Sequence, residues 1–133
     1  IEQTRGYIHT QGNMSTVVPI IKPFKVVLML RGRYAGKKAV ILQVCEPTAE
    51  RPYEHVLVAG LEKAPKLVSK RMSEKTLFRR TKMNVFLKYV NVNHILITRY
   101  TFSGKLPTPT EVMSLDQRRN SLNNLRNVLI QSY

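Results

Sequence analysis

Two apolar runs joined by a short basic link constrain the fold of this chain more than any other feature. The runs cover residues 24–31 (FKVVLMLR) and 37–45 (KKAVILQVC) and are rich in β-branched and large apolar side chains, which is typical of β-strands. Apolar residues occur on both faces of the first run, and this favours a small, strongly curved barrel over a sheet with one polar face. We expect the barrel core to contain Val26, Leu28, Leu30, Val40 and Leu42.

Further strand patterns follow the first two. A loop at 46–52 contains two prolines, which cannot donate to a strand ladder and therefore separate the second strand from the third. Short runs of alternating or continuous apolar residues then predict three more strands, at 53–60, 84–92 and 95–102.

Two segments carry helix signals. Ser73 begins a short segment, 73–81, that predicts a helix with this serine as its cap. Near the end of the sequence, Ser114 and Gln117 have the spacing of a capping box, and apolar residues then recur at helical intervals. We expect one amphipathic C-terminal helix there.

The composition divides the chain into four parts. Residues 1–13 are polar and without periodicity, so Met14 is a candidate for the natural start, and an ordinary flexible arm is the alternative. The predicted parts are a flexible N-terminal extension (1–21), a barrel domain (22–102), a linker with prolines and a glycine (103–112) and the C-terminal helix (113–133).

Net charge limits the choice of partner. Twenty-two Lys and Arg oppose eight Asp and Glu, which gives a net charge of +14. Such an excess causes self-repulsion unless a polyanion neutralises it. Nucleic acid is the commonest polyanion, and an anionic membrane surface is the alternative. The C-terminal amphipathic segment carries few cations, which disfavours a membrane partner. No apolar run approaches the roughly 20 residues that span a bilayer, so we expect a soluble intracellular chain.

The link between the first two strands is the first candidate binding site. Gly32 and Gly36 frame Arg33, Tyr34 and Ala35, and glycine permits positive φ and close backbone approach. From residue 22 to residue 38 there are six cations and no acid, whereas a merely solvated turn usually mixes both signs. We expect this stretch to bind phosphate groups, with Tyr34 free to stack on a base. The candidate residues are Lys22, Lys25, Arg31, Arg33, Tyr34, Gly36, Lys37 and Lys38.

A second basic segment follows the third strand. Between residues 63 and 88 there are nine cations, and Glu74 is the only acid. Two such stretches in one small domain favour a common nucleic-acid patch over two unrelated solvated faces. Its candidate residues are Lys66, Lys70, Arg71, Arg79, Arg80 and Lys82, and His94 and Arg99 are added further along the chain.

The sequence gives little support for catalysis. The spacing of His55, His94 and Cys45 matches no metal-ligand pattern, and no hydrolase, phosphate-loop or dinucleotide motif occurs. Cys45 is expected to be a small core residue, and His94 either anchors a turn or touches RNA. We therefore expect no enzymatic activity, no cofactor, no metal site and no small-molecule substrate.

The motifs also carry a family resemblance. KPFKVVLMLRGRYAGKKAVILQV (22–44) resembles the KOW motif, a strand–loop–strand unit of ribosomal and transcription proteins. RPYEHVLVAGLEKAPKLVSKRM (51–72) and KYVNVNHILITRY (88–100) are similar to the matching segments of the L27e family of eukaryotic large-subunit ribosomal proteins. The similarity covers about residues 22–102. Phe24 departs from it where glycine is usual, and Ile97 where proline is usual.

The resemblance implies a fold, a location and partners. The fold would be mainly β with α, a small SH3-like barrel followed by a C-terminal amphipathic helix. The chain would be a structural constituent of the large subunit, bound to ribosomal RNA and neighbouring ribosomal proteins. It would act in the cytosolic ribosome after assembly in the nucleus. The alternative is a KOW-type RNA-binding factor acting in transcription or RNA processing. The KOW loop falls on Arg31 to Lys38, and the N-H…T-R-Y segment falls on Asn93, His94, Thr98, Arg99 and Tyr100.

Overall fold

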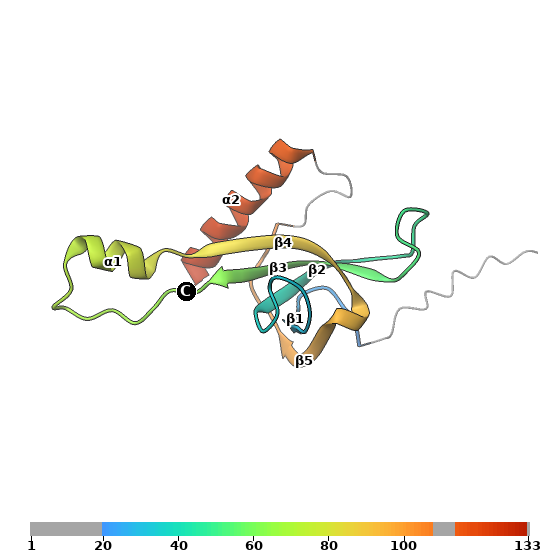
Figure 1. Cartoon of the computed structure of the whole chain (residues 1–133), viewed down its shortest axis with the longest axis horizontal. Coiled ribbons are helices and arrows are strands. Elements are labelled where there is room, and N and C mark those ends of the chain that lie inside the picture. Colours follow the sequence, from blue (N-terminus) through green and yellow to red (C-terminus); the bar gives the residue numbers. More distant parts are fainter. Residues whose placement is uncertain (1–19, 108–113, 133) are drawn as a thin grey trace, which may run out of the picture.

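A computed structural model describes residues 20–107 and 114–132, and the five expected strands join there in one antiparallel sheet. The order across the sheet is β4-β3-β2-β1-β5, and Figure 1 shows the arrangement. All five strand predictions are confirmed, since each observed strand overlaps its predicted range. The strands are β1 (Lys25–Met29), β2 (Lys38–Cys45), β3 (His55–Lys63), β4 (Asn84–Asn91) and β5 (Ile95–Thr101).

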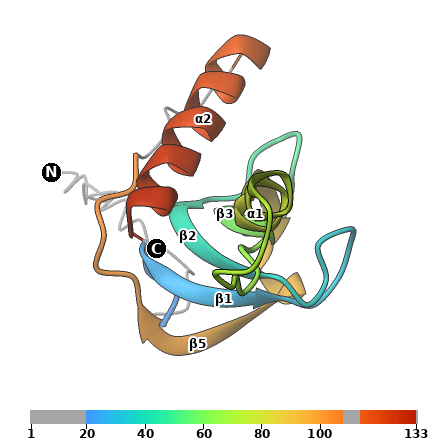
Figure 2. The ribbon, with the colours of Figure 1, turned by 90° about the vertical axis from the view of Figure 1, so that its left-hand side faces the viewer.

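Irregular pairing accompanies the curvature of this sheet. The register shifts once in each of three pairings: between Lys25 and Val27 in β1, between Ile41 and Gln43 in β2, and between Leu61 and Lys63 in β3. Such bulges bend a strand and increase its twist. Figure 2 shows the sheet curving from β3 through β2 and β1 to β5. The expected class, a small β-barrel followed by a C-terminal helix, is confirmed.

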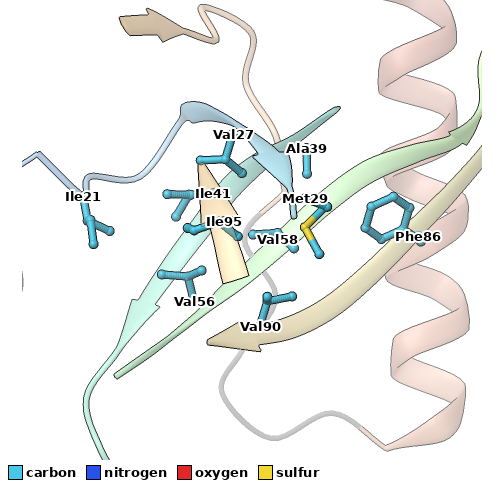
Figure 3. Packing of buried hydrophobic residues seen from close by; sticks show 10 residues of the cluster. All are labelled: Ile21, Val27, Met29, Ala39, Ile41, Val56, Val58, Phe86, Val90 and Ile95. Carbon is cyan, nitrogen blue, oxygen red and sulfur yellow. The ribbon is translucent and has the colours of Figure 1, made fainter. Parts of the chain in front are cut away.

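The concave face of the sheet encloses the inner cluster of apolar side chains (Figure 3). Val27 and Ile41 are fully buried there, and Val56 and Val58 of β3 lie against them. Burial of this kind stabilises a fold by about 1.5–3 kcal/mol for each large apolar side chain. The inner cluster comprises Ile21, Val27, Met29, Ala39, Ile41, Val56, Val58, Phe86, Val90 and Ile95.

The convex face also carries apolar side chains, and the helix α2 (Leu115–Ser132) covers them (Figures 1 and 2). Leu125 of α2 is fully buried, and Leu106, which precedes the helix in the chain, is nearly so. The outer cluster comprises Leu42, Leu57, Ala59, Leu87, Leu106 and Leu125. The two apolar faces of the strands thus have two different partners, the barrel interior and α2.

The predicted core was assigned to the wrong face of β1. Leu30 is 51% exposed, while Val26 and Leu28 are only half-buried. Of the other two predicted core residues, Leu42 is buried in the outer cluster, and Val40 packs half-buried against it. The inner face instead carries their chain neighbours, because successive side chains of a strand point to opposite faces.

Both helices form where their signals predict them. At α2, the Ser114 amide donates to Gln117 Oε1 at 3.0 Å and the Gln117 amide donates to Ser114 Oγ at 3.3 Å, so the capping box is confirmed. Ser73 takes the cap position of α1 (Glu74–Thr81), but its hydroxyl donates to the Thr76 hydroxyl at 3.1 Å and makes no bond to the backbone.

Residues 1–19 of the predicted extension, Met14 among them, and residues 108–112 of the predicted linker lie outside the described residues. Residues 20–21 and 103–107 are described, and one residue of each group is buried. Ile21, assigned to the extension, is 4% exposed and belongs to the inner cluster. Leu106, assigned to the linker, belongs to the outer cluster. Both therefore contribute to the core of the barrel and its helix.

Candidate nucleic-acid interface

The β1–β2 loop, residues 30–37, is held in a defined turn by its backbone. The Gly36 amide donates to the Met29 carbonyl at 2.7 Å, and the Met29 amide donates to the Lys37 carbonyl at 3.0 Å. Gly32 and Gly36 have φ values of 91° and 76°, and residues that carry a side chain rarely adopt this region of φ. The prediction that these glycines supply positive φ is confirmed.

The cations of the β1–β2 loop and of the adjoining end of β2 face solvent. Arg31, Arg33, Lys37 and Lys38 are all exposed. Among the residues that the structure describes, the one ion pair joins Arg119 to Asp116 of α2, at 3.9 Å. None of the four cations therefore has a carboxylate partner there, and each is available to an external anion.

Tyr34 is tied to the barrel. Its ring lies parallel to that of Phe86, with centroids 4.0 Å apart and an interplanar angle of 2°, and it packs half-buried against the inner cluster. One face of the tyrosine is therefore occupied by a protein ring. This contact fixes the β1–β2 loop on β4 and leaves base stacking by Tyr34 as a prediction.

Both basic segments leave the sheet at the same end. The second is the β3–β4 arm, residues 64–83, which contains α1 and extends beyond the sheet in Figure 1. In the register of the sheet, Ala39 pairs with Gly60 and Lys63 pairs with Asn84. The beginning of β2, the end of β3 and the beginning of β4 therefore lie together. The structure thus brings the β1–β2 loop and the base of the arm to one edge of the barrel.

The β3–β4 arm is ordered mainly by polar contacts along its own backbone. The Lys66 amide donates to the Arg80 carbonyl at 2.9 Å, and Arg80 Nη1 donates to the Leu67 carbonyl at 3.2 Å. No residue of α1 is buried. The predicted binding residues of the β3–β4 arm are exposed except Arg80, which is half-buried. They are Lys66, Lys70, Arg71, Arg79, Arg80 and Lys82.

The remaining predicted residues divide between two places. His94 ends a short 3₁₀ turn, η1 (Val92–His94), and its carbonyl accepts the Leu30 amide at 2.9 Å. It therefore lies at the base of the β1–β2 loop. Lys25 lies at the opposite end of β1, where its Nζ donates to the Arg99 carbonyl at 3.1 Å, and exposed Lys22 precedes it by one turn. These two lysines and Arg99 form a separate group.

The predicted list missed Lys88 and Arg118, which line a hollow together with the β1–β2 loop. This cationic hollow has a volume of about 310 Å³ and lies along the free edge of β4. Strand alternation places Lys88 on the same face as Phe86, which could have suggested it, but no sequence signal brings Arg118 to β4. The hollow is lined by Arg33, Tyr34, Val85, Phe86, Leu87, Lys88, Arg118 and Leu122.

The buried histidine, His55, packs between aromatic side chains. His55 is 5% exposed; its Nδ1 lies 3.1 Å from the Tyr53 carbonyl, and its ring meets Tyr53 and Tyr89 edge-on. Within the described ranges, no three His, Cys, Asp or Glu side chains come together in a way that could hold a metal.

Comparison with known protein families shows which family this chain belongs to. The model of the Ribosomal L27e protein family matches residues 26–129, which is most of the chain. The chain belongs to the L27e family. Its relatives include the large ribosomal subunit protein eL27 of Tetrahymena thermophila, which is 42% identical over 85% of this chain and 82% of that protein. The eL27B protein of Schizosaccharomyces pombe and the eL27 protein of Pisum sativum are each 38% identical, over 88% of this chain and 90% of theirs.

The L27e match extends beyond the 22–102 range of the resemblance and includes most of α2. The structure also shows the backbone consequence of one departure of this L27e chain from the usual pattern. Phe24 has φ of 64° in a turn closed by the Lys25 amide and the Lys22 carbonyl, at 3.4 Å. Pro23 precedes it, and this kind of turn favours proline and then glycine. Phenylalanine here therefore accepts strained backbone while packing against the outer cluster.

Proposed function

We propose that this L27e chain is a structural constituent of the large ribosomal subunit in cytosolic ribosomes and has no enzymatic role. The family match and the relatives named as large ribosomal subunit proteins support this. Within the described part of the chain, no helix is both long and apolar enough to cross a membrane.

The chain binds ribosomal RNA through the edge of the barrel that carries the β1–β2 loop and the β3–β4 arm. The single observation behind this is the set of exposed loop cations without a carboxylate partner among the described residues. Guanidinium and ammonium groups in this state bond strongly to phosphate oxygens. Phosphate contacts position a protein without reading sequence, so site choice depends on the shape of the RNA.

A salt titration of large-subunit RNA binding tests the interface. The variant has Arg31, Arg33, Lys37 and Lys38 replaced by alanine, and its fold is checked by circular dichroism. Each cation that neutralises a phosphate contributes about 0.7–0.9 to the slope of log affinity against log salt, so we expect the slope to fall by roughly two to three units. An unchanged slope in the folded variant would reject the loop as a binding element.

A matched pair of double variants separates the interface from general charge. Lys37→Ala with Lys38→Ala removes one cation of the loop and the adjoining cation of β2, and Lys105→Ala with Arg119→Ala removes two exposed cations elsewhere. We expect the first pair to lower the slope by about 1.5 units and the second to lower it clearly less. Equal effects would mean that total charge, and not this edge, governs binding.

Sedimentation of a cell lysate tests the ribosomal assignment itself. A structural constituent is expected in the large-subunit and polysome fractions after a high-salt wash. Recovery of the protein only in light fractions would instead support a KOW-type factor that acts in transcription or RNA processing.

A further inference from the structure

The cationic hollow joins three positive side chains from distant parts of the chain. Arg33 comes from the β1–β2 loop, Lys88 from β4 and Arg118 from the first turns of α2, and no carboxylate is among the lining residues. A larger hollow shares Lys88 and Arg118 but is also lined by Glu46 and Glu50. An anion is therefore favoured in the first hollow over the second.

Two of the cations are already positioned by the fold. Arg118 Nη2 donates to the Leu87 carbonyl at 2.7 Å, and because a guanidinium carries five N–H donors, others remain for a ligand. Lys88 Nζ lies 3.8 Å from the place where a Cβ on Gly32 would be. The Lys88 ammonium therefore lies beside the loop, at ordinary contact distance from Gly32.

The rest of the lining is aromatic and aliphatic. Tyr34 and Phe86 form a stacked pair, and Val85 and Leu122 add apolar surface. A volume of about 310 Å³ is at the small end of the roughly 300–1,000 Å³ typical of ligand pockets. This combination suits a phosphate attached to a sugar and a flat ring, and it is too small for a duplex.

We propose that the cationic hollow binds one nucleotide unit of single-stranded RNA. Its phosphate lies among Arg33, Lys88 and Arg118, and its sugar or base lies against the Tyr34–Phe86 wall. The inference rests on the proposed function, since the ligand is part of the RNA that the chain binds. It adds α2 to the interface and gives Arg118 a binding role.

The test measures the affinity of the full chain for a fluorescently labelled decauridylate by anisotropy. Arg118→Ala is compared with Arg119→Ala, which removes the same charge from the next residue of the same helix. Lys88→Ala is compared with Lys105→Ala. We expect about a tenfold loss for each hollow residue and less than about twofold for each control. Equal losses within both pairs would overturn the proposal.

A double-variant cycle guards against a purely structural effect, because Arg118→Ala also removes the bond to Leu87. Lys88 is exposed, so Lys88→Ala should leave the fold unchanged, as circular dichroism can check. If both cations hold one phosphate, the double variant should bind at least about threefold more tightly than the product of the single losses predicts. Independent, multiplying losses would contradict a shared phosphate.

Competition experiments identify the ligand chemistry. Uridine monophosphate should displace the decauridylate at lower concentration than inorganic phosphate does, because the sugar and base add contacts to the aromatic wall. Equal competition would overturn the nucleotide part of the proposal. The hollow variants retain Arg31, Lys37 and Lys38. If the hollow variants lose no more affinity than their controls while the loop variant shows a reduced salt slope, the hollow is rejected and the proposed function is left intact.

Discussion

Replacing Gly60 by alanine should disturb the support of the β1–β2 loop from inside the barrel. Gly60 pairs across the sheet with Phe86, and the ring of Phe86 stacks on Tyr34 with centroids 4.0 Å apart. A Cβ on residue 60 would overlap the Phe86 ring, with Cε1 at 2.7 Å, and would lie 2.8 Å from the Lys38 carbonyl oxygen. Gly60, Phe86 and Tyr34 therefore contact one another in sequence, from β3 to the β1–β2 loop.

The size of the effect follows from what can move. The Lys38 carbonyl belongs to the backbone of β2, and Phe86 is 4% exposed with Tyr34 on its far side. Neither neighbour can retreat freely, and overpacking of this kind costs about 1–3 kcal/mol. For a domain of this size, we expect the melting temperature to fall by on the order of 10 °C.

Urea unfolding followed by circular dichroism measures this loss, and a second variant tests its cause. Phe86→Leu replaces the ring that the new methyl group would meet with a shorter side chain. Gly60→Ala should therefore cost less in the Phe86→Leu background than in the unsubstituted chain, although the contact with the Lys38 carbonyl remains. A Gly60→Ala chain as stable as the unsubstituted one would refute the reasoning. So would equal costs in the two backgrounds.

Two further predictions concern backbone strain and the docking of α2. Because Phe24 has φ of 64°, Phe24→Gly should be more stable than Phe24→Ala by about 1 kcal/mol in urea unfolding, and a more stable alanine variant would show that the turn relaxes without strain. Leu125→Ala should cost about 2–5 kcal/mol because Leu125 is fully buried in the outer cluster, whereas Leu115→Ala on the same helix, where the side chain is 78% exposed, should change stability by less than about 0.5 kcal/mol. Similar losses for the two leucines would mean that α2 does not dock on the sheet as described.

The local sequence alone determined the elements and the loop. Runs of β-branched and large apolar residues identified all five strands, because such side chains fit a pleated, buried surface. Gly32 and Gly36 indicated positive φ, since only glycine adopts it without a steric penalty. Ser114 and Gln117 located the start of α2 through their reciprocal bonds. These signals act over a few residues and need no knowledge of the rest of the fold.

The tertiary structure decided which strand face lies inside and which residues meet. A strand that is apolar on both faces gives no alternation from which to choose the inner one, so Val27 was buried where Val26 and Leu28 were expected. Only the docking of α2 explains the second apolar face. The same docking brings Arg118 to the carbonyl of Leu87, 31 residues away along the chain. Contacts at such separations depend on the packing of whole elements, and no local pattern of residues encodes them.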